Sequence, residues 1–280
     1  MSNKCWIKTN FEIELKGLDK TVGIYFSGTG NTKYCLNKFL EYYIGSKENK
    51  QYSIEDGNCI KEIVDNNDIV LAYPIYYSDL PIIFRNFIID NKEIFKNKNI
   101  FIIVTMGLFS GDGAGCSARL LKKYGANIIG GLHLKMPDCI GDVKALKKSL
   151  EENKMIVKKA NIKIKETVDN IKNGYYSKDG LTFINHLAGL FGQRLYFYKK
   201  TNKLKNKLKI DYEKCISCGK CSNLCPMKNI KMIDNKPLPQ NKCTSCYRCI
   251  SNCPRQAITL IGNEVLEQCT IEKYIDSNTN

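Results

Sequence analysis

Residues 215–226 read CISCGKCSNLCP, and residues 243–254 read CTSCYRCISNCP. The two stretches share the spacing Cys-x2-Cys-x2-Cys-x3-Cys-Pro, and each cysteine of the first returns in the second after 28 residues. The likeness extends beyond sulfur, because Ser217 and Ile230 also have the same residue type 28 positions later. The region is therefore an internal repeat, and it holds eight of the 14 cysteines in the chain.

Four thiolates around a compact inorganic core are what a [4Fe–4S] cluster needs, and in bacterial runs of this spacing the fourth cysteine serves the other cluster. The repeat therefore predicts two clusters that exchange their fourth ligand. We expect the two ligand sets to be Cys215, Cys218, Cys221 and Cys253, and Cys243, Cys246, Cys249 and Cys225. Zinc is the alternative, although it usually takes two separated Cys-x2-Cys pairs, and a disulfide scaffold suits a secreted protein.

A second informative stretch lies near the N-terminus, where the β-rich run Thr21–Phe26 ends in Ser27-Gly-Thr-Gly-Asn-Thr32 and a helical pattern follows. Gly28 and Gly30 let the backbone come close to a ligand, while side-chain donors and the first amides of the helix suit an anion. The spacing matches neither a Walker loop nor a dinucleotide fingerprint, whose third glycine would replace Lys33. We expect a phosphate site, and a tight turn without a ligand is the alternative.

Further apolar runs predict strands at Asp68–Tyr73, Asn99–Met106 and Ala126–Lys135, with a weaker signal at Phe11–Leu15. Helical patterns are expected at Pro81–Asp90, Ala114–Tyr124 and, as one long amphipathic helix, Val143–Lys172. Strands that are apolar on both faces and alternate with helices favour a parallel sheet covered on both sides.

Ligands of such a doubly wound sheet bind beyond the carboxyl ends of its strands. The loops 72–81 and 105–115 follow two central strands and would join the glycine loop at that edge. Tyr76 and Tyr77 offer aromatic faces to a planar ring, and the later loop offers glycines and free amides. Together the three loops describe a flavin site.

On these residues the chain resembles fusion proteins with an N-terminal flavodoxin-like region and a C-terminal bacterial two-cluster ferredoxin. The resemblance implies an α/β fold with a doubly wound parallel five-stranded sheet, joined to a small α+β two-cluster ferredoxin domain. It implies that FMN is bound by Ser27, Gly28, Thr29, Gly30, Asn31, Thr32, Pro74, Tyr76, Tyr77, Thr105, Met106, Gly107, Phe109, Gly111, Asp112 and Gly113. Many flavodoxins have glycine after the stacking aromatic residue, whereas this chain reads Tyr77-Ser78-Asp79.

The chain divides into segments of different composition. We expect an N-terminal extension at 1–20, a flavodoxin-like FMN domain at 21–173, an aromatic and then basic connector at 174–210, a two-cluster ferredoxin domain at 211–262 and a polar tail at 263–280. With 43% hydrophobic and 25% charged residues, 20 glycines and 7 prolines, the composition excludes collagen-like and wholly disordered classes.

The formal net charge of +15 favours an acidic redox partner, although about six negative charges of two clusters and FMN would lower it toward +9. No nucleic-acid recognition motif accompanies the lysines. No run of about 20 apolar residues predicts a membrane span, and no signal peptide is visible, so a cytoplasmic location is expected.

Structural roles are expected for the remaining candidates, which are His133, His186, Cys5, Cys35, Cys59, Cys116, Cys139 and Cys269.

These features favour a metal-binding, oxidoreductase-type electron-transport protein that passes electrons between two [4Fe–4S] clusters and FMN, and on to a redox partner. One alternative is a flavin-dependent reductase of a small molecule, with the clusters supplying its electrons. Another is a binding module whose flavodoxin-like domain is empty. Whether the chain is an enzyme stays open at this point.

Overall fold

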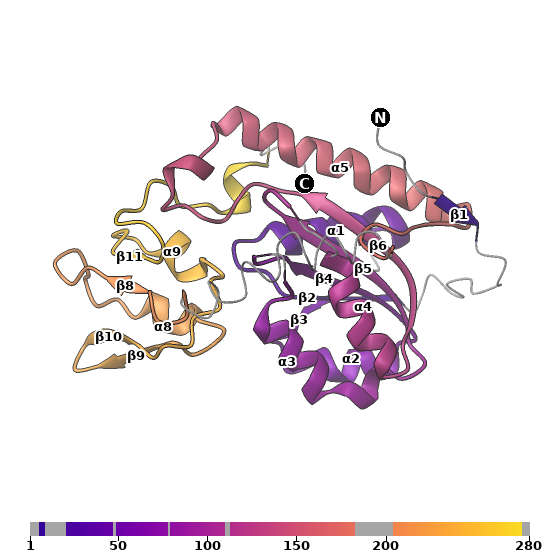
Figure 1. Cartoon of the computed structure of the whole chain (residues 1–280), viewed down its shortest axis with the longest axis horizontal. Coiled ribbons are helices and arrows are strands. Elements are labelled where there is room, and N and C mark those ends of the chain that lie inside the picture. The colour runs from indigo at the N-terminus through magenta and orange to yellow at the C-terminus, as the bar shows by residue number, and fades with distance from the viewer. Residues whose placement is uncertain are drawn as a thin grey trace.

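The computed structural model describes residues 6–8, 21–46, 49–77, 79–109, 113–182 and 204–275. They form an α/β unit built around one parallel sheet and a smaller cysteine-rich unit at one end of the molecule (Figure 1). The predicted strand at Phe11–Leu15, and also His186, Gly111 and Asp112, lie outside the described residues.

The sheet contains five parallel strands, as predicted. They are β2 (Thr21–Tyr25), β3 (Gln51–Ser53), β4 (Asp68–Pro74), β5 (Asn99–Met106) and β6 (Asn127–Lys135). Their spatial order is β3-β2-β4-β5-β6. This is the flavodoxin-like strand order, in which the chain reverses its direction of winding between β2 and β4 and leaves a crevice at their carboxyl ends.

Five helices cover the two faces of the sheet. They are α1 (Asn31–Ile44), α2 (Cys59–Asp65), α3 (Ile82–Asp90), α4 (Gly113–Lys123) and α5 (Leu150–Lys172). One core packs α1 and α5 on a face that includes Val70 and Ile103, and the other packs α2, α3 and α4 on a face that includes Leu71 and Ile102. Alternate residues of β4 and β5 therefore enter different cores, which is why their runs are apolar throughout.

The long helix α5 begins later than its apolar pattern predicts. The expected start at Val143 is wrong, because the side chain of Ser149 accepts a hydrogen bond from the Glu152 amide at 3.1 Å and the Glu152 carboxylate accepts one from the Ser149 amide at 2.8 Å. This capping box fixes the first turn at Leu150, and a short 3-10 turn, η3 (Lys144–Leu146), precedes it.

Two elements of this unit had no clear sequence signal, the edge strand β3 and the short helix α2. A further 3-10 turn, η2 (Lys92–Phe95), follows α3, and the strands β1 (Trp6–Lys8) and β7 (Tyr175–Ser177) form a separate antiparallel pair. His133 has a structural contact, since its Nε2 accepts a hydrogen bond of 3.0 Å from the amide of Ala114 at the start of α4.

The cysteine-rich unit shows the repeat in three dimensions. Its first half holds β8 (Lys209–Ile210), α8 (Lys220–Leu224) and β9 (Ile230–Ile233), and its second half holds β10 (Lys236–Pro239), α9 (Arg248–Asn252) and β11 (Ile258–Thr259). The halves exchange strands, because β8 pairs with β11 and β9 with β10, both antiparallel. The helices α8 and α9 stand 28 residues apart, as the cysteines do.

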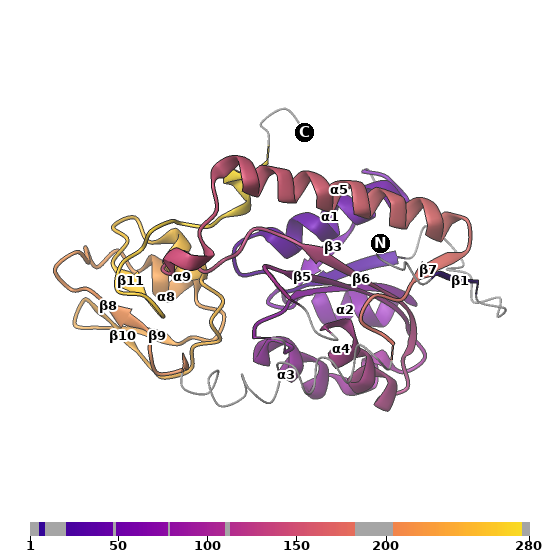
Figure 2. The same ribbon diagram turned by 45° about the horizontal axis from the view of Figure 1, so that its top comes forward.

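The segment after the repeat returns to the α/β unit, where it lies near the start of α5 (Figure 2). It contains the 3-10 turn η5 (Ile271–Lys273), and the side chains of Ile271 and Tyr274 are buried in the core shared by α1 and α5. The expected polar tail is therefore partly a core element.

None of the helices among the described residues is long and apolar enough to cross a membrane.

Candidate functional site

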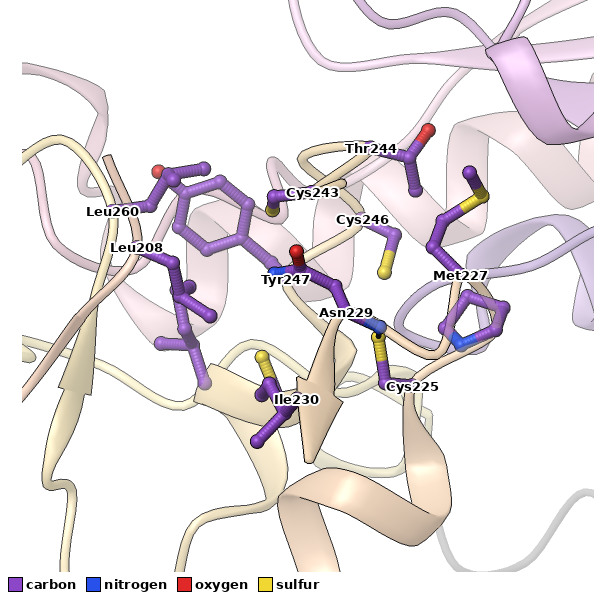
Figure 3. A pocket seen from close by; sticks show the side chains of 13 residues that line it. Leu208, Cys225, Met227, Asn229, Ile230, Cys243, Thr244, Cys246, Tyr247 and Leu260 are labelled. Atoms are coloured by element: carbon purple, nitrogen blue, oxygen red, sulfur yellow. Dashed lines mark hydrogen bonds between the residues drawn. The ribbon is translucent and has the colours of Figure 1, made fainter. Parts of the chain in front are cut away.

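The cysteines of the repeat surround two separate cavities. One is lined by Cys225, Cys243, Cys246 and Cys249, and Figure 3 shows it with the apolar side chains of Leu208, Ile230 and Leu260 nearby. The other is lined by Cys215, Cys218, Cys221 and Cys253. We call them the proximal and distal thiol sets, because only the first lies beside the sheet-edge cavity described below. Each set combines three cysteines from one half of the repeat with the fourth from the other half.

Backbone amides point at four of the thiols, in pairs 28 residues apart. The amides of Ser217 and Ser245 lie 3.5 and 3.4 Å from the Sγ atoms of Cys215 and Cys243. The amides of Asn229 and Ala257 lie 3.2 and 3.3 Å from those of Cys225 and Cys253. Amide donors of this kind stabilise thiolate sulfur and tune a cluster bound to it.

Four thiols around one cavity match the four cysteine ligands of a [4Fe–4S] cluster. Across the described ranges, no group of three or more His, Cys, Asp or Glu side chains is placed to hold a single metal ion. The thiols instead line the walls of cavities. Burial raises the pKa of Cys243 to about 11 and that of Cys246 to about 12. Positive charge from a bound metal would offset this penalty, because metal ligation deprotonates a thiol.

A cavity of about 800 Å³ lies at the carboxyl edge of the parallel sheet. It falls within the ordinary size range of small-molecule and cofactor sites. The predicted residues that line it are Ser27, Gly28, Thr29, Asn31, Thr32, Pro74, Tyr76, Tyr77, Thr105, Met106, Gly107 and Phe109. Gly30 and Gly113 do not line it and instead mark the starts of α1 and α4.

The glycine loop provides an anion-binding end to this cavity. Gly30 adopts a left-handed conformation with φ of 95°, and α1 begins at the next residue. The hydroxyl of Ser27 is buried and has no hydrogen-bond partner within the described part of the chain. The Oγ1 atoms of Thr32 and Thr105 lie 2.7 Å apart and so connect the first turn of α1 to the end of β5. An unpartnered buried hydroxyl beside a helix N-terminus fits a phosphate oxygen.

The two tyrosines stand on a tight turn. The backbones of Tyr76 and Asp79 exchange two hydrogen bonds of 3.1 Å, and Tyr77 takes a left-handed φ of 52° without being glycine. The Asp79 carboxylate accepts a hydrogen bond of 2.7 Å from Arg85, which anchors the turn to α3. Burial raises the pKa of the Tyr76 hydroxyl well above its usual value, so this group stays protonated.

Sequence reasoning missed one wall of the cavity. The missed residues are Met136, Pro137, Asp138, Cys139, Ile140, Val143, Ala145 and Leu146 after β6, together with Ile75, Leu108, Leu204, Lys207, Ser245 and Ile261. The position of the loop after β6 was a usable signal, because parallel strands end at one sheet edge. Asp138 faces Gly107, and burial raises the pKa of its carboxyl group.

The two units meet beside this cavity. The Arg248 guanidinium donates to the Ser27 carbonyl at 2.8 Å and to both carboxylate oxygens of Glu55 at 2.7 and 2.8 Å. A Cβ atom on Gly28 would overlap the carbonyl oxygen of Cys246. The glycine loop is therefore in contact with a cysteine of the proximal set.

Residues 207–269 match the family model described as "4Fe-4S dicluster domain". The C-terminal unit is a 4Fe-4S domain. With the flavodoxin-like sheet before it, the chain has the architecture of a flavodoxin–ferredoxin fusion. No curated protein matches the chain.

Similar solved structures cover the N-terminal part. They include Fusobacterium nucleatum flavodoxin bound to flavin mononucleotide, with 19% identity, a TM-score of 0.39, and coverage of 56% of this chain and 99% of that one. A flavodoxin from the domain Archaea has 18% identity, a TM-score of 0.35, and coverage of 54% and 99%. We assign the flavodoxin-like fold from the strand order rather than from these likenesses.

Proposed function

We propose that this flavodoxin–ferredoxin chain is an electron-transfer protein that binds FMN in the sheet-edge cavity and a [4Fe–4S] cluster at each thiol set. A [4Fe–4S] cluster exchanges one electron at a time, and FMN accepts one or two. The contact of Gly28 with Cys246 carries the proposal, because it brings the phosphate loop against the proximal thiol set. Ser245 supports it further, since this residue lines the cavity while its amide points at Cys243.

The arrangement favours an order in which the cavity, the proximal set and the distal set follow one another. The proximal thiol Cys246 is buried, whereas the distal thiol Cys218 is exposed. Ile216, which lines the distal cavity, is 58% exposed. We therefore assign exchange with an external redox partner to the distal end.

The surface of this end suits a partner of opposite charge. Lys231, Lys236 and Arg255 are exposed on the cysteine-rich unit, and Arg255 also lines the distal cavity. An apolar centre with a charged rim is typical of transient protein interfaces, and opposite charge speeds their association. An acidic redox protein is the partner we propose, and raising the salt concentration should slow its reaction.

A second candidate function is supported by the outer part of the sheet-edge cavity. Phe109 lines the cavity and is 69% exposed, and Leu204 and Lys207, from the expected connector region, line the same cavity. An apolar rim with one cation suits a small anionic or aromatic substrate, so reduction of a small molecule at the flavin is the alternative.

Anaerobic reductive titration of the purified holoprotein tests the proposal. Full reduction should consume about four electrons per chain, two by FMN and one by each cluster. The flavin absorbance and the broad cluster absorbance should both bleach. Uptake of about two electrons with no flavin signal, or none at all, would overturn the proposal. Rapid reoxidation by an added small molecule, but not by an acidic redox protein, would favour the reductase.

A further inference from the structure

We propose that Arg248 is a positioning residue through which the proximal cluster completes the flavin cavity, so that iron loading controls the affinity for FMN. This inference rests on the proposed function, because it concerns the same two sites. What it adds is a coupling between the two cofactors: FMN affinity depends on whether the proximal cluster is present, although each site could exist without the other.

The contacts of Arg248 connect the two sites directly. This residue begins α9 and lies between the proximal thiols Cys246 and Cys249 in the sequence. Its guanidinium bonds the Ser27 carbonyl in the glycine loop, and it forms a bidentate pair with Glu55. The side chain is only 17% exposed. A planar guanidinium held by four hydrogen bonds, the fourth to the Leu224 carbonyl at 3.2 Å, has one orientation.

The residues just before Arg248 form part of the cavity wall. Ser245 lines the cavity, and the Cys246 carbonyl lies against Gly28. The segment from Cys243 to Cys249 thus carries three proximal thiols on one side and faces the glycine loop on the other. A segment ordered by metal ligation loses that order without the metal, since the free energy of metal binding is also free energy of folding.

The repeat contains its own comparison for this role. Lys220 stands 28 residues before Arg248 and begins α8 as Arg248 begins α9. Lys220 is exposed, and it forms no ion pair with any residue that the structure describes. A cation at this position is therefore not tied to the other unit in the distal half. The contact of a repeat cation with the glycine loop is therefore made by Arg248 of the proximal half and not by Lys220 of the distal half.

Two sites linked in this way must affect each other equally. If the proximal cluster raises the affinity for FMN by some factor, bound FMN raises the affinity for the cluster by the same factor. Iron-free chains would then hold FMN weakly, and iron-loaded chains would hold it tightly.

The test measures the FMN dissociation constant anaerobically by quenching of flavin fluorescence. Relative to the reconstituted wild type, Cys249→Ser should weaken FMN binding on the order of tenfold or more, because Cys249 belongs to the proximal set but does not line the flavin cavity. Cys218→Ser, which removes a distal thiol, should leave the constant within about twofold of the wild type. Iron content of each variant identifies which set was lost.

If Cys249→Ser does not fold, Arg248→Met in the iron-loaded protein tests the coupling instead. This variant should weaken FMN binding on the order of tenfold. Lys220→Met removes the matching cation of the other half and should have no effect. By reciprocity, saturating FMN should slow iron loss to a chelator in the wild type but not in Arg248→Met.

The outcomes separate the two proposals. Equal FMN affinity of iron-loaded wild type, Arg248→Met and Cys249→Ser would overturn the coupling and leave the proposed function intact. Failure of the iron-loaded wild type to bind FMN at all would instead overturn the proposed function.

Discussion

The carboxylate of Asp142 accepts a hydrogen bond of 2.9 Å from the hydroxyl of Tyr247, and this pair joins the two units of the chain. Asp142 lies in the loop after β6, whereas Tyr247 directly follows the proximal thiol Cys246. The second oxygen of Asp142 accepts from the amides of Leu260 and Ile261 at 2.7 and 2.9 Å. Asp142 is only 4% exposed, so its charge is compensated by these three donors.

Replacing Asp142 should therefore loosen the contact between the units. Asp142→Ala leaves three donors without an acceptor and should cost about 3 kcal/mol or more, whereas Tyr247→Phe removes one donor and should cost about 1 kcal/mol. The temperature at which the holoprotein loses its visible cluster absorbance measures both effects. Asp169→Ala, which removes an exposed carboxylate 3.8 Å from Lys165, is the control and should change little. An equal effect of all three variants would contradict the role of Asp142.

Gly28 should tolerate no side chain. In Gly28→Ala the new Cβ would overlap the Cys246 carbonyl and lie 2.8 Å from the Tyr76 hydroxyl oxygen, so the loop or the proximal segment must move. We expect weaker FMN binding and a perturbed paramagnetic resonance spectrum of the reduced proximal cluster. Gly57→Ala is the matched control, because a Cβ there meets no atom within 4 Å. An FMN affinity unchanged in Gly28→Ala would show that the two sites are not in contact.

The carboxyl group of Asp138 should make FMN binding depend on pH. Burial raises its pKa, with the hydrogen bond from the Ile140 amide and then the charge of Lys148 partly opposing the shift, so the group loses its charge as the pH falls through a value above its usual one. An anionic carboxylate in the cavity wall disfavours an anionic ligand, and wild-type affinity should rise on acidification.

Asp138→Asn keeps an acceptor for the Ile140 amide, now 3.0 Å from Oδ1, while removing the charge. It should bind FMN severalfold more tightly than the wild type at pH 8, with the difference shrinking as the pH falls. The dissociation constants of both proteins are measured at each pH from 8 downward. Their ratio at each pH cancels the contribution of the phosphate's own ionisation, because it is the same for both proteins. A constant ratio of affinities at all pH values would exclude Asp138 as the titrating group.

Elements with dense local signals could be predicted from the sequence. The strand Asn99–Met106 has the predicted bounds because every residue from Ile100 to Val104 is buried, which requires an uninterrupted apolar run. The crossed thiol sets could be predicted because the repeat is regular and, in bacterial runs of this spacing, the fourth cysteine serves the other cluster. Strand β3 had no such signal, because its three residues are only half-buried at the sheet edge.

Contacts between distant residues explain what could not be predicted. Arg248 and Ser27 are 221 residues apart, and Asp142 and Tyr247 are 105 apart, so no local pattern relates them. Arg248 is one of 43 lysine and arginine residues, and nothing in its local sequence distinguishes it from the others. The buried position of Ile271 likewise depends on a hydrogen bond of 3.1 Å from its amide to the Thr29 carbonyl.

Iron and FMN content of anaerobically reconstituted protein tests the central claim most directly. The wild type should contain about eight iron atoms and one FMN per chain, because two thiol sets and one flavin cavity are present. Cys225→Ser should lose the cluster of Cys243, Cys246 and Cys249 and retain about four iron atoms on the distal set. About four iron atoms in the wild type, zinc in place of iron, or a Cys225→Ser protein that loses the distal cluster instead would contradict the account.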